Sequence, residues 1–320
     1  MGDYLKVLDI EHSGGPRIGL LGDDPAHTVR VHGESSGLYQ TLQDCARRHQ
    51  DHLAHLRHLP GPTHTLPALR QETRLRPPAM PDNPLLTHVS GLPLGARDDA
   101  GWFYKGNGRV LRIDRDDLEV PYHVQAIAAD ACLVSIYLVG SRGQLLHVGV
   151  TLGHDLHDPL QGQSARAHLL ECAVASELLL GELDEPLHLR QRIERNGTCF
   201  SETHLRLDPQ AWRASREAGE ALLEQHPQFL QPGMVHYLFS RLDSEIVATH
   251  LQHGDCLELS CPMLEMRLEN RIVEEELRHL LPLSSRRRTG QGRAASAHRS
   301  CPAHATKKTP HLSAAFPVEP

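Results

Sequence analysis

The chain has 320 residues, is 39% hydrophobic and 4% aromatic, and carries a net charge of -7. No apolar stretch reaches the roughly 18 residues that a membrane helix needs, and an acidic body argues against nucleic acid as the main partner. The N-terminal MGDYLKVLDI lacks the pattern of a secretory signal, so we expect a cytoplasmic protein. Seven scattered cysteines without a C-x-x-C pair predict reduced, mostly buried thiols.

The first hundred residues predict a small β-rich unit followed by a connector. Short apolar pieces within residues 4–31, separated by Gly14-Gly15, predict a β-meander. Residues 36–59 have helical apolar spacing, and Pro60 follows them. Residues 60–101 are rich in proline and glycine, which indicates a connector.

The remainder predicts a larger domain with strands and two helices. The apolar segments 132–140 and 144–153, with Arg142-Gly143 between them, predict a β-hairpin. Two further segments, 164–181 and 209–226, are interpreted as helices, the second beginning at Asp208 and Pro209. Strands are expected at 234–242 and 256–261. From about residue 284 the chain is basic and has no periodic apolar pattern, which is typical of disorder. The expected division is 1–60 as a small N-terminal domain, 61–101 as connector, 102–282 as main domain and 283–320 as disordered basic tail.

Three segments, in this order, resemble the fumarylacetoacetate hydrolase family. The first is WFYKGNG (102–108), similar to that family's F-x-K motif at the start of the catalytic domain. The second is the block 129–159, where the family has a strand bearing E-x-E, a hairpin and a second strand. The third, 230–272, is similar to the family's P-G-D strand, its L-x-x-G-D-x-V-E segment and its closing L-x-N-x-V. The resemblance implies an α+β protein: a mostly-β roll or sandwich domain of fumarylacetoacetate hydrolase type, preceded by a small β-rich domain.

Two further segments point to one subgroup. QRIERNGTCFSE (191–202) and the connector LRPPAMPDNPLLTHVSGLPLG (75–95) are similar to segments of the 2-keto-3-deoxy-sugar-acid dehydratases. This resemblance implies a homodimeric hydrolase or lyase that acts on a 2-keto or diketo sugar-derived acid. It also implies a divalent metal, Mg²⁺ or Mn²⁺, held by two carboxylates at i and i+2 on one strand and a third on the next strand.

The metal positions of the family match this chain only in part. They correspond to Asp130, Cys132 and Asp155, and a thiol is poorly suited to Mg²⁺. No lysine occurs in 156–185, where the family normally has one. The lid segment that supplies a catalytic histidine in the subgroup is deleted here, and His88 is a candidate substitute.

Two functions stay open at this point. In the first, an enzyme with a shifted metal site uses Asp130 and Asp155 with His154, His157 or Asp158, and Cys132 in reserve. Imidazole and thiolate ligands would also suit Zn²⁺ or Fe²⁺. Lys105 and Arg241 are then candidates to bind an acidic substrate, and Lys105 and His88 are candidates for catalysis.

In the second, the chain is a catalytically impaired relative that serves as a binding or structural protein. Loss of several groups that stabilise one charged intermediate removes most of a rate enhancement. Convergence of Asp130, Cys132 and Asp155 on one pocket would favour the enzyme. A pocket filled by Arg241 would favour the catalytically impaired protein. A nucleic-acid-binding role for the RRR sequence is disfavoured, since short basic tails are usually solvated.

Overall fold

The computed structural model describes residues 4–12, 14–22, 28–33, 36–97, 101–162, 164–242 and 248–275. The predicted tail, 283–320, lies outside these ranges. Within them, no helix combines the length and apolar character needed to cross a membrane.

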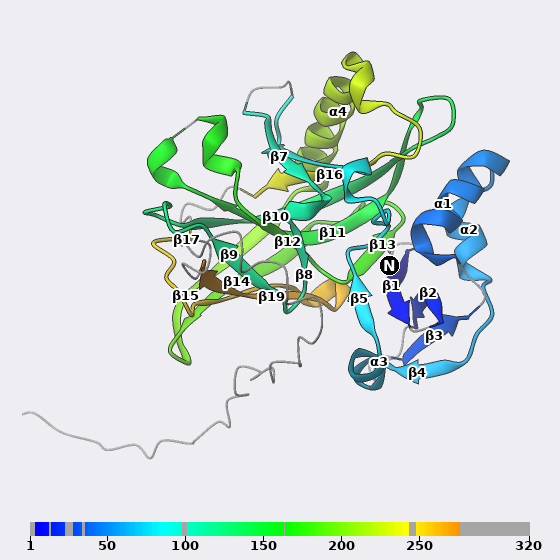
Figure 1. The fold of residues 1–320 in the computed structure, drawn as a ribbon, viewed down its shortest axis with the longest axis horizontal. Helices are drawn as coiled ribbons and strands as arrows, with labels where there is room; N and C mark the ends of the chain where they lie inside the picture. The colour runs from blue at the N-terminus through cyan, green and yellow to red at the C-terminus, as the bar shows by residue number, and fades with distance from the viewer. Residues whose placement is uncertain are drawn as a thin grey trace, which may run out of the picture. The chain divides into compact units, whose positions relative to one another are not determined.

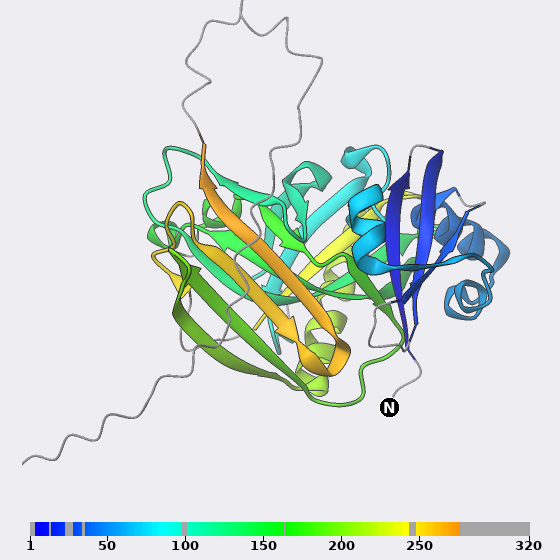
Figure 2. The ribbon, with the colours of Figure 1, turned by 90° about the horizontal axis from the view of Figure 1, so that it is seen from below.

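Two β-sheets carry the fold (Figures 1 and 2). The described strands of the larger sheet are β1 (Leu5–His12), β2 (Gly15–Leu21), β3 (Thr28–His32), β4 (Thr63–Thr65), β5 (Arg74–Arg76), β6 (Thr87–Pro93), β7 (Phe103–Asn107), β8 (Leu111–Ile113), β10 (Ala128–Val139), β11 (Leu145–His157), β12 (Cys172–Val174), β13 (Glu177–Leu180), β16 (Val235–Arg241) and β17 (Ala248–Thr249). Its main path runs β4-β3-β2-β1-β13-β11-β10-β16-β6-β7.

The smaller sheet packs against one face of the larger one. Its strands are β9 (Asp117–Val120), β14 (Leu187–Arg195), β15 (Thr198–Leu207), β18 (Cys256–Cys261) and β19 (Met266–Glu274), in the order β15-β14-β18-β19-β9. Buried leucines of β10 and β11 meet those of β14, β18 and β19 in one apolar cluster between the sheets. The mostly-β, α+β fold class predicted from the sequence is therefore confirmed.

Four α-helices occur in the described residues: α1 (Gly37–Arg48), α2 (His52–Arg57), α3 (Leu66–Glu72) and α4 (Pro209–Gln225). Short 3₁₀ turns are η1 (Pro84–Leu86), η2 (Gly108–Val110), η3 (Pro159–Gln161), η4 (Ala165–His168), η5 (Pro227–Phe229) and η6 (Pro262–Leu264). The helix predicted at 209–226 is confirmed as α4, and the Asp208 carboxylate caps it by accepting from the backbone N–H groups of Gln210 and Ala211.

The central hairpin is also confirmed. β10 and β11 pair antiparallel along almost their whole length, and the turn between them places Gly143 at φ 77°, a conformation that glycine adopts without strain. The strands expected at 234–242 and 256–261 are β16 and β18. These regular apolar segments form the scaffold from which the candidate site projects.

Two helix predictions are corrected. Residues 164–181 form η4 and the strands β12 and β13, because AVASELLL is buried between neighbouring strands and pairs with β1 and β11. Helical spacing there is overridden by tertiary pairing. The single helix predicted at 36–59 is two helices, because His49 adopts a left-handed conformation and Asp51 caps a new helix.

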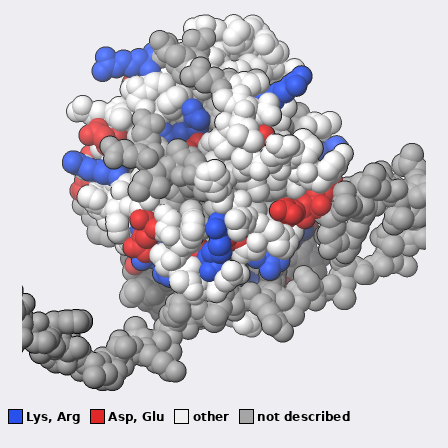
Figure 3. All heavy atoms as spheres, turned by 90° about the vertical axis from the view of Figure 1, so that its left-hand side faces the viewer, with Lys and Arg blue, Asp and Glu red and all other residues white. Residues whose placement is uncertain are grey.

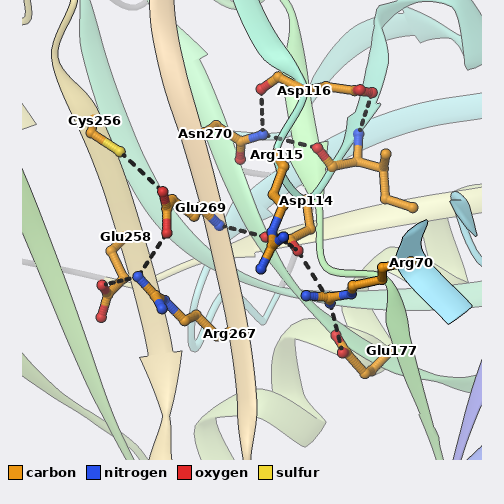
Figure 4. Close-up of polar contacts among 11 residues, drawn as sticks. Arg70, Asp114, Arg115, Asp116, Glu177, Cys256, Glu258, Arg267, Glu269 and Asn270 are labelled. Atoms are coloured by element: carbon orange, nitrogen blue, oxygen red, sulfur yellow. Dashed lines mark hydrogen bonds and ion pairs between the residues drawn. The ribbon is translucent and has the colours of Figure 1, made fainter. Parts of the chain in front are cut away.

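The N-terminal strands extend the larger sheet through the pairing of β1 with β13. A buried polar cluster reinforces this junction: Arg70 of α3 lies 3.2 Å from an oxygen of Asp114 and 3.4 Å from one of Glu177 (Figure 4). In addition, β6 lies in the predicted connector but pairs in parallel with β16, so part of the connector is built into the sheet. The predicted division into domains stays a prediction.

Candidate active site

Asp130 and Asp155 face each other across the central hairpin. They are cross-strand partners in the register of β10 and β11, so their side chains share one face of the sheet. Cys132 lies two residues after Asp130 and His157 two residues after Asp155, so both share that face. The structure thus brings together four of the six candidate metal ligands on one face, Asp130, Cys132, Asp155 and His157.

His154 lies on the opposite face of β11. Its Nδ1 is 3.2 Å from the side-chain oxygen of Asn270 in the smaller sheet, and burial lowers its pKa to about 4. Asn270 in turn donates to the backbone oxygens of Ile113 and Asp116 (Figure 4). His154 is therefore a neutral core residue between the sheets and does not belong to the site. Asp158, predicted as an alternative metal ligand to His154 and His157, accepts a hydrogen bond from the backbone N–H of Leu160 and caps η3.

Lys105 reaches the site because the larger sheet curls. In the sheet order, β10, β16 and β6 separate β7 from β11, yet the Lys105 ammonium on β7 donates to the Leu156 carbonyl of β11 at 2.8 Å. It also donates to the His168 carbonyl at 3.1 Å, and its Nζ lies 2.5 Å from Oδ1 of Asp155. The side chains of Lys105 and Asp155 are fully buried. The lysine thus links β7 to β11 on the inside of the curled sheet.

His168 completes the surroundings of Asp155. Its Nδ1 is 3.2 Å from Oδ2 of Asp155, and its ring stacks on Phe103 with 3.7 Å between centroids. Burial alone would raise the pKa of Asp155, but the Lys105 ammonium and the His168 contact together hold it well below its usual range. Asp155 is therefore a fixed anion with both oxygens engaged.

Asp130 has a different environment. Its Oδ2 lies 3.3 Å from Nδ1 of His157 and 3.7 Å from Nη1 of Arg241. Burial raises its pKa, and Asp155 adds to the rise, against the lowering effects of His157 and Arg241. The side chains of Asp130, His157 and Arg241 keep 10%, 14% and 25% of their surface exposed, so they form the solvent-facing layer of the site.

Arg241 lies on β16 directly opposite Cys132 in register, with its guanidinium carbon 5.3 Å above the Phe103 ring. Its Nε is buried and has no hydrogen-bond partner. The Arg241 side chain as a whole keeps 25% of its surface exposed, so its guanidinium beside Asp130 is a suitable donor for an anionic ligand.

The residues at the family's metal positions do not fit a divalent ion. Mg²⁺ requires several oxygen ligands in near-octahedral geometry, whereas both oxygens of Asp155 are engaged by Lys105 and His168. Cys132 is fully buried, and burial raises the pKa of its thiol well above the usual value, so it is neither a carboxylate nor a thiolate. Across the part of the chain that the structure describes, no three His, Cys, Asp or Glu side chains are grouped so as to hold a metal.

His88, a predicted catalytic residue, lies elsewhere. Its ring packs 4.4 Å from Phe229, 4.9 Å from Tyr104 and 5.0 Å from His236, measured between centroids. Tyr104 directly precedes Lys105 on β7, so the two side chains point to opposite faces. The structure therefore does not bring His88 to the two carboxylates. Burial lowers its pKa to about 3, and the nearby His236 adds to this effect.

Sequence reasoning missed His168 and Phe103 as site residues. His168 is one of 24 histidines and lies in a segment that the sequence predicted as helix, so no local signal marked it. Lys105 carried a better signal, because only four of the 33 lysines and arginines are lysines. Strand alternation around Asp155 could have excluded His154 and retained His157.

The sequence matches no protein-family model and no curated protein. Solved structures do match. A 2-keto-3-deoxyarabinonate dehydratase superposes with a TM-score of 0.63 at 15% identity, covering 85% of this chain and 99% of that one. The 2-keto-3-deoxy-D-arabinonate dehydratase complexed with magnesium and 2,5-dioxopentanoate has a TM-score of 0.61 at 14% identity, with the same coverage. A 2-hydroxyhepta-2,4-diene-1,7-dioate isomerase from Mycobacterium marinum has a TM-score of 0.53 at 15% identity, again with the same coverage. The chain therefore has the fold of the fumarylacetoacetate hydrolase superfamily.

Proposed function

We propose that this chain is an enzyme that transfers a proton at the carbon next to the keto group of a small 2-keto or diketo acid, without a resident divalent ion. The observation that carries the proposal is the pairing of Asp130 and Asp155: two carboxylates in register, one with a raised and one with a lowered pKa. Carboxylates whose environments separate their pKa values in this way take different roles in acid–base catalysis.

Asp130 is the proposed catalytic base. Its side chain keeps 10% of its surface exposed, whereas that of Asp155 keeps none, and a raised pKa brings a carboxylate closer to the range in which it can accept and return a proton near neutral pH. In the proposed step its carboxylate takes a proton from the carbon beside the keto group, and the electron pair of that C–H bond forms the enolate. In an acid with a conjugated double bond, return of the proton from Asp130 to the far carbon of the dienolate isomerises it. In an acid with a hydroxyl on the next carbon, that hydroxyl leaves as water with the proton that Asp130 carries, which dehydrates the acid.

Arg241 and His157 are proposed to bind the substrate's oxygens. The guanidinium of Arg241, whose side chain keeps 25% of its surface exposed, can donate to the substrate carboxylate, and an N–H of His157 beside Asp130 can donate to the enolate oxygen. Lys105 and Asp155 are fully buried, so they act behind this layer and do not touch the substrate. The similar structure of the 2-keto-3-deoxy-D-arabinonate dehydratase is a complex with 2,5-dioxopentanoate, which supports a small keto acid as the substrate class.

A second candidate is a binding protein without turnover. It is favoured by the position of Arg241, whose guanidinium lies against Asp130 and over Phe103, where it covers part of the proposed site. Such a protein would bind the keto acid and leave its carbon-bound protons unchanged. The predicted homodimer and the cytoplasmic location stay predictions.

Deuterium exchange tests the proposal without knowledge of the natural substrate. The untagged chain, freed of metal ions, is incubated in D₂O with pyruvate, 2-oxobutanoate and a 2-keto-3-deoxy-sugar acid, and proton NMR follows the signal beside the keto group. We expect catalysed loss of the signal, reduced by roughly 10²–10⁴-fold in Asp130→Asn. Asp184→Asn, on an exposed carboxylate, is the matched control. Exchange that is equally fast in Asp130→Asn, or absent with every keto acid, would refute the enzyme, and binding without exchange would establish the second candidate.

A further inference from the structure

The ring of Phe103 contacts both halves of the site. Phe103 lies on β7 and is 4% exposed. Its ring stacks on that of His168, with 3.7 Å between centroids and 14° between planes, and the Arg241 guanidinium carbon lies over the ring at 5.3 Å from its centroid. His168 belongs to the surroundings of Asp155, and Arg241 to those of Asp130. Phe103 is therefore an apolar element that the two carboxylate environments share.

The residue opposite Phe103 leaves room for this ring. Gly91 of β6 is the cross-strand partner of Phe103. A Cβ atom at position 91 would lie 2.5 Å from Cζ of Phe103 and 2.8 Å from the backbone oxygen of Phe239. The second contact is with the neighbouring strand β16, so a change of side-chain rotamer could not relieve it. Glycine at this position thus permits the ring, and the flat stack on His168 holds it in place.

Charge alone does not explain the position of Arg241. Within the described residues its one ion pair is with Asp130, and the 3.7 Å between Nη1 and Oδ2 is longer than a hydrogen bond. Its Nε is buried and has no hydrogen-bond partner. A guanidinium over an aromatic ring is attracted by the negative charge of the ring face, and more strongly where water is partly excluded. The contact with Phe103 therefore contributes to holding the guanidinium where it lies.

We infer that Phe103 is a positioning residue for the substrate: its ring holds the Arg241 guanidinium over the site, close to Asp130 but not hydrogen-bonded to it, so that the N–H groups stay available to the carboxylate of a keto acid. The inference rests on the proposed function in one respect, that Arg241 binds the substrate. Without the attraction of the ring, the guanidinium can turn to Asp130 and form a direct, charge-assisted hydrogen bond. A substrate would then have to break that bond before it could bind.

Fluorination of the ring separates this role from packing. Phe103→pentafluorophenylalanine in the full, untagged chain nearly keeps the shape of the ring and removes the negative charge of its face. We expect Kd for pyruvate, measured by titration calorimetry, to rise by roughly 2–30-fold, the range of a cation–π contact. The same replacement at Phe200, whose ring centroid lies 4.0 Å from the guanidinium carbon of Arg195 in the smaller sheet, is the matched control and should leave Kd unchanged.

Two results of this titration would overturn the inference. Unchanged binding in the Phe103 variant would show that the ring does not position Arg241. Tighter binding would show that the ring holds Arg241 where it blocks the substrate. If pyruvate does not bind the wild type, the measurement that follows decides the inference without any substrate.

The Nε–H group of Arg241 reports its own position. In a chain labelled with ¹⁵N-arginine, its NMR signal is assigned with Arg241→Met, and its exchange with solvent is measured. We expect slow exchange in the wild type, because this group is buried, and exchange faster by roughly 2–30-fold in the fluorinated chain and in Phe103→Leu. Equal rates in the wild type and the fluorinated chain would contradict the inference, provided that urea unfolding finds the two equally stable. The fluorinated chain keeps the test decisive if Phe103→Leu does not fold.

The outcomes for the inference and for the proposed function can be told apart. Deuterium exchange into keto acids tests the proposed function in the wild type. If it fails while Arg241 responds to fluorination of Phe103, the guanidinium is positioned as inferred and the proposed reaction is wrong. If keto acids exchange and Arg241 does not respond, the reaction stands and Phe103 has no positioning role.

Discussion

Asp130 and Asp155 are direct cross-strand neighbours, yet the structure moves their pKa values in opposite directions. The difference arises from position within the curled sheet. Asp155 points toward the closing strand, where Lys105 and His168 hold it as an anion. Asp130 lies nearer the opening, where desolvation outweighs its contacts with His157 and Arg241. One anion is thereby fixed as part of the scaffold, and the other is left able to exchange a proton.

Arg241→Met should impair substrate binding more than the chemical step. The methionine keeps much of the apolar contact with Phe103 but removes the guanidinium donors. We expect KM for the keto acid to rise by roughly 10–100-fold, since a charge-assisted hydrogen bond contributes about 1.5–3 kcal/mol, with a smaller change in kcat. Steady-state kinetics measure both. Arg142→Met, at an exposed hairpin turn, is the control, and a fall in kcat with unchanged KM would contradict the role.

Either single change in the Lys105–Asp155 pair should be strongly destabilising. Lys105→Met leaves Asp155 buried without its partner, and Asp155→Asn leaves the ammonium buried beside a neutral amide. Each should lower the free energy of unfolding by about 3–5 kcal/mol, measured by urea denaturation of the full chain in chelator. The double variant should cost less than the sum of the two, because it removes both charges. Additive losses would show that the two side chains are not coupled.

The matched control for this cycle is the exposed pair of Arg213 and Asp184, whose side chains keep 43% and 69% of their surface accessible. Exposed pairs contribute about 0–1 kcal/mol. Similar losses at both pairs would indicate that Lys105 and Asp155 are not held in a buried environment.

The sequence predicted the parts of the fold that depend on local pattern. The hairpin of β10 and β11 has long apolar strands and a glycine turn, and α4 has its aspartate cap and a proline in the first turn. The helix prediction for 164–181 was wrong, because the leucine run of this segment fits a helix and a buried strand equally well. Only pairing with β1 and β11 decides between the two.

The site was predictable only along single strands. Asp130, Asp155 and His157 follow from alternation within β10 and β11, and they do share a face. The partners of Asp155 were not predictable, because Lys105 comes from a strand four places away in the sheet and His168 from a short 3₁₀ turn. Their meeting depends on the curl of the sheet, which no local spacing records. His88, the candidate substitute for the lid histidine, lies on a strand of the same sheet, but its ring packs against Tyr104, Phe229 and His236, away from the two carboxylates.

Cys132 should be unreactive in the folded chain. Its sulfur is fully buried, and burial raises the pKa of the thiol well above the usual value, so neither access nor thiolate is available. In a Cys199→Ser/Cys301→Ser chain, we expect negligible labelling by a disulfide reagent in native buffer and rapid labelling in guanidinium. The wild type should label at the exposed Cys199. Fast labelling of Cys132 in native buffer, located by peptide mass spectrometry, would contradict this prediction and show that the reagent reaches the buried bottom of the site.

Glu177 should make stability fall as pH rises. Burial, and then the nearby Asp114, raise its pKa to about 7 from an ordinary 4.5, against the opposing effect of Arg70 (Figure 4). A carboxyl whose folded pKa is raised contributes stability that is complete below about pH 4.5 and is lost as the pH passes through 7. Wild-type stability should therefore decline from pH 5 to pH 8 more steeply than that of Glu177→Gln, whose side chain cannot ionise. At pH 8 the variant should be the more stable by about 1–3 kcal/mol, measured by urea unfolding. Glu182→Gln, on an exposed carboxylate, should follow the wild type, and parallel curves for all three proteins would show that Arg70 keeps Glu177 ionised throughout.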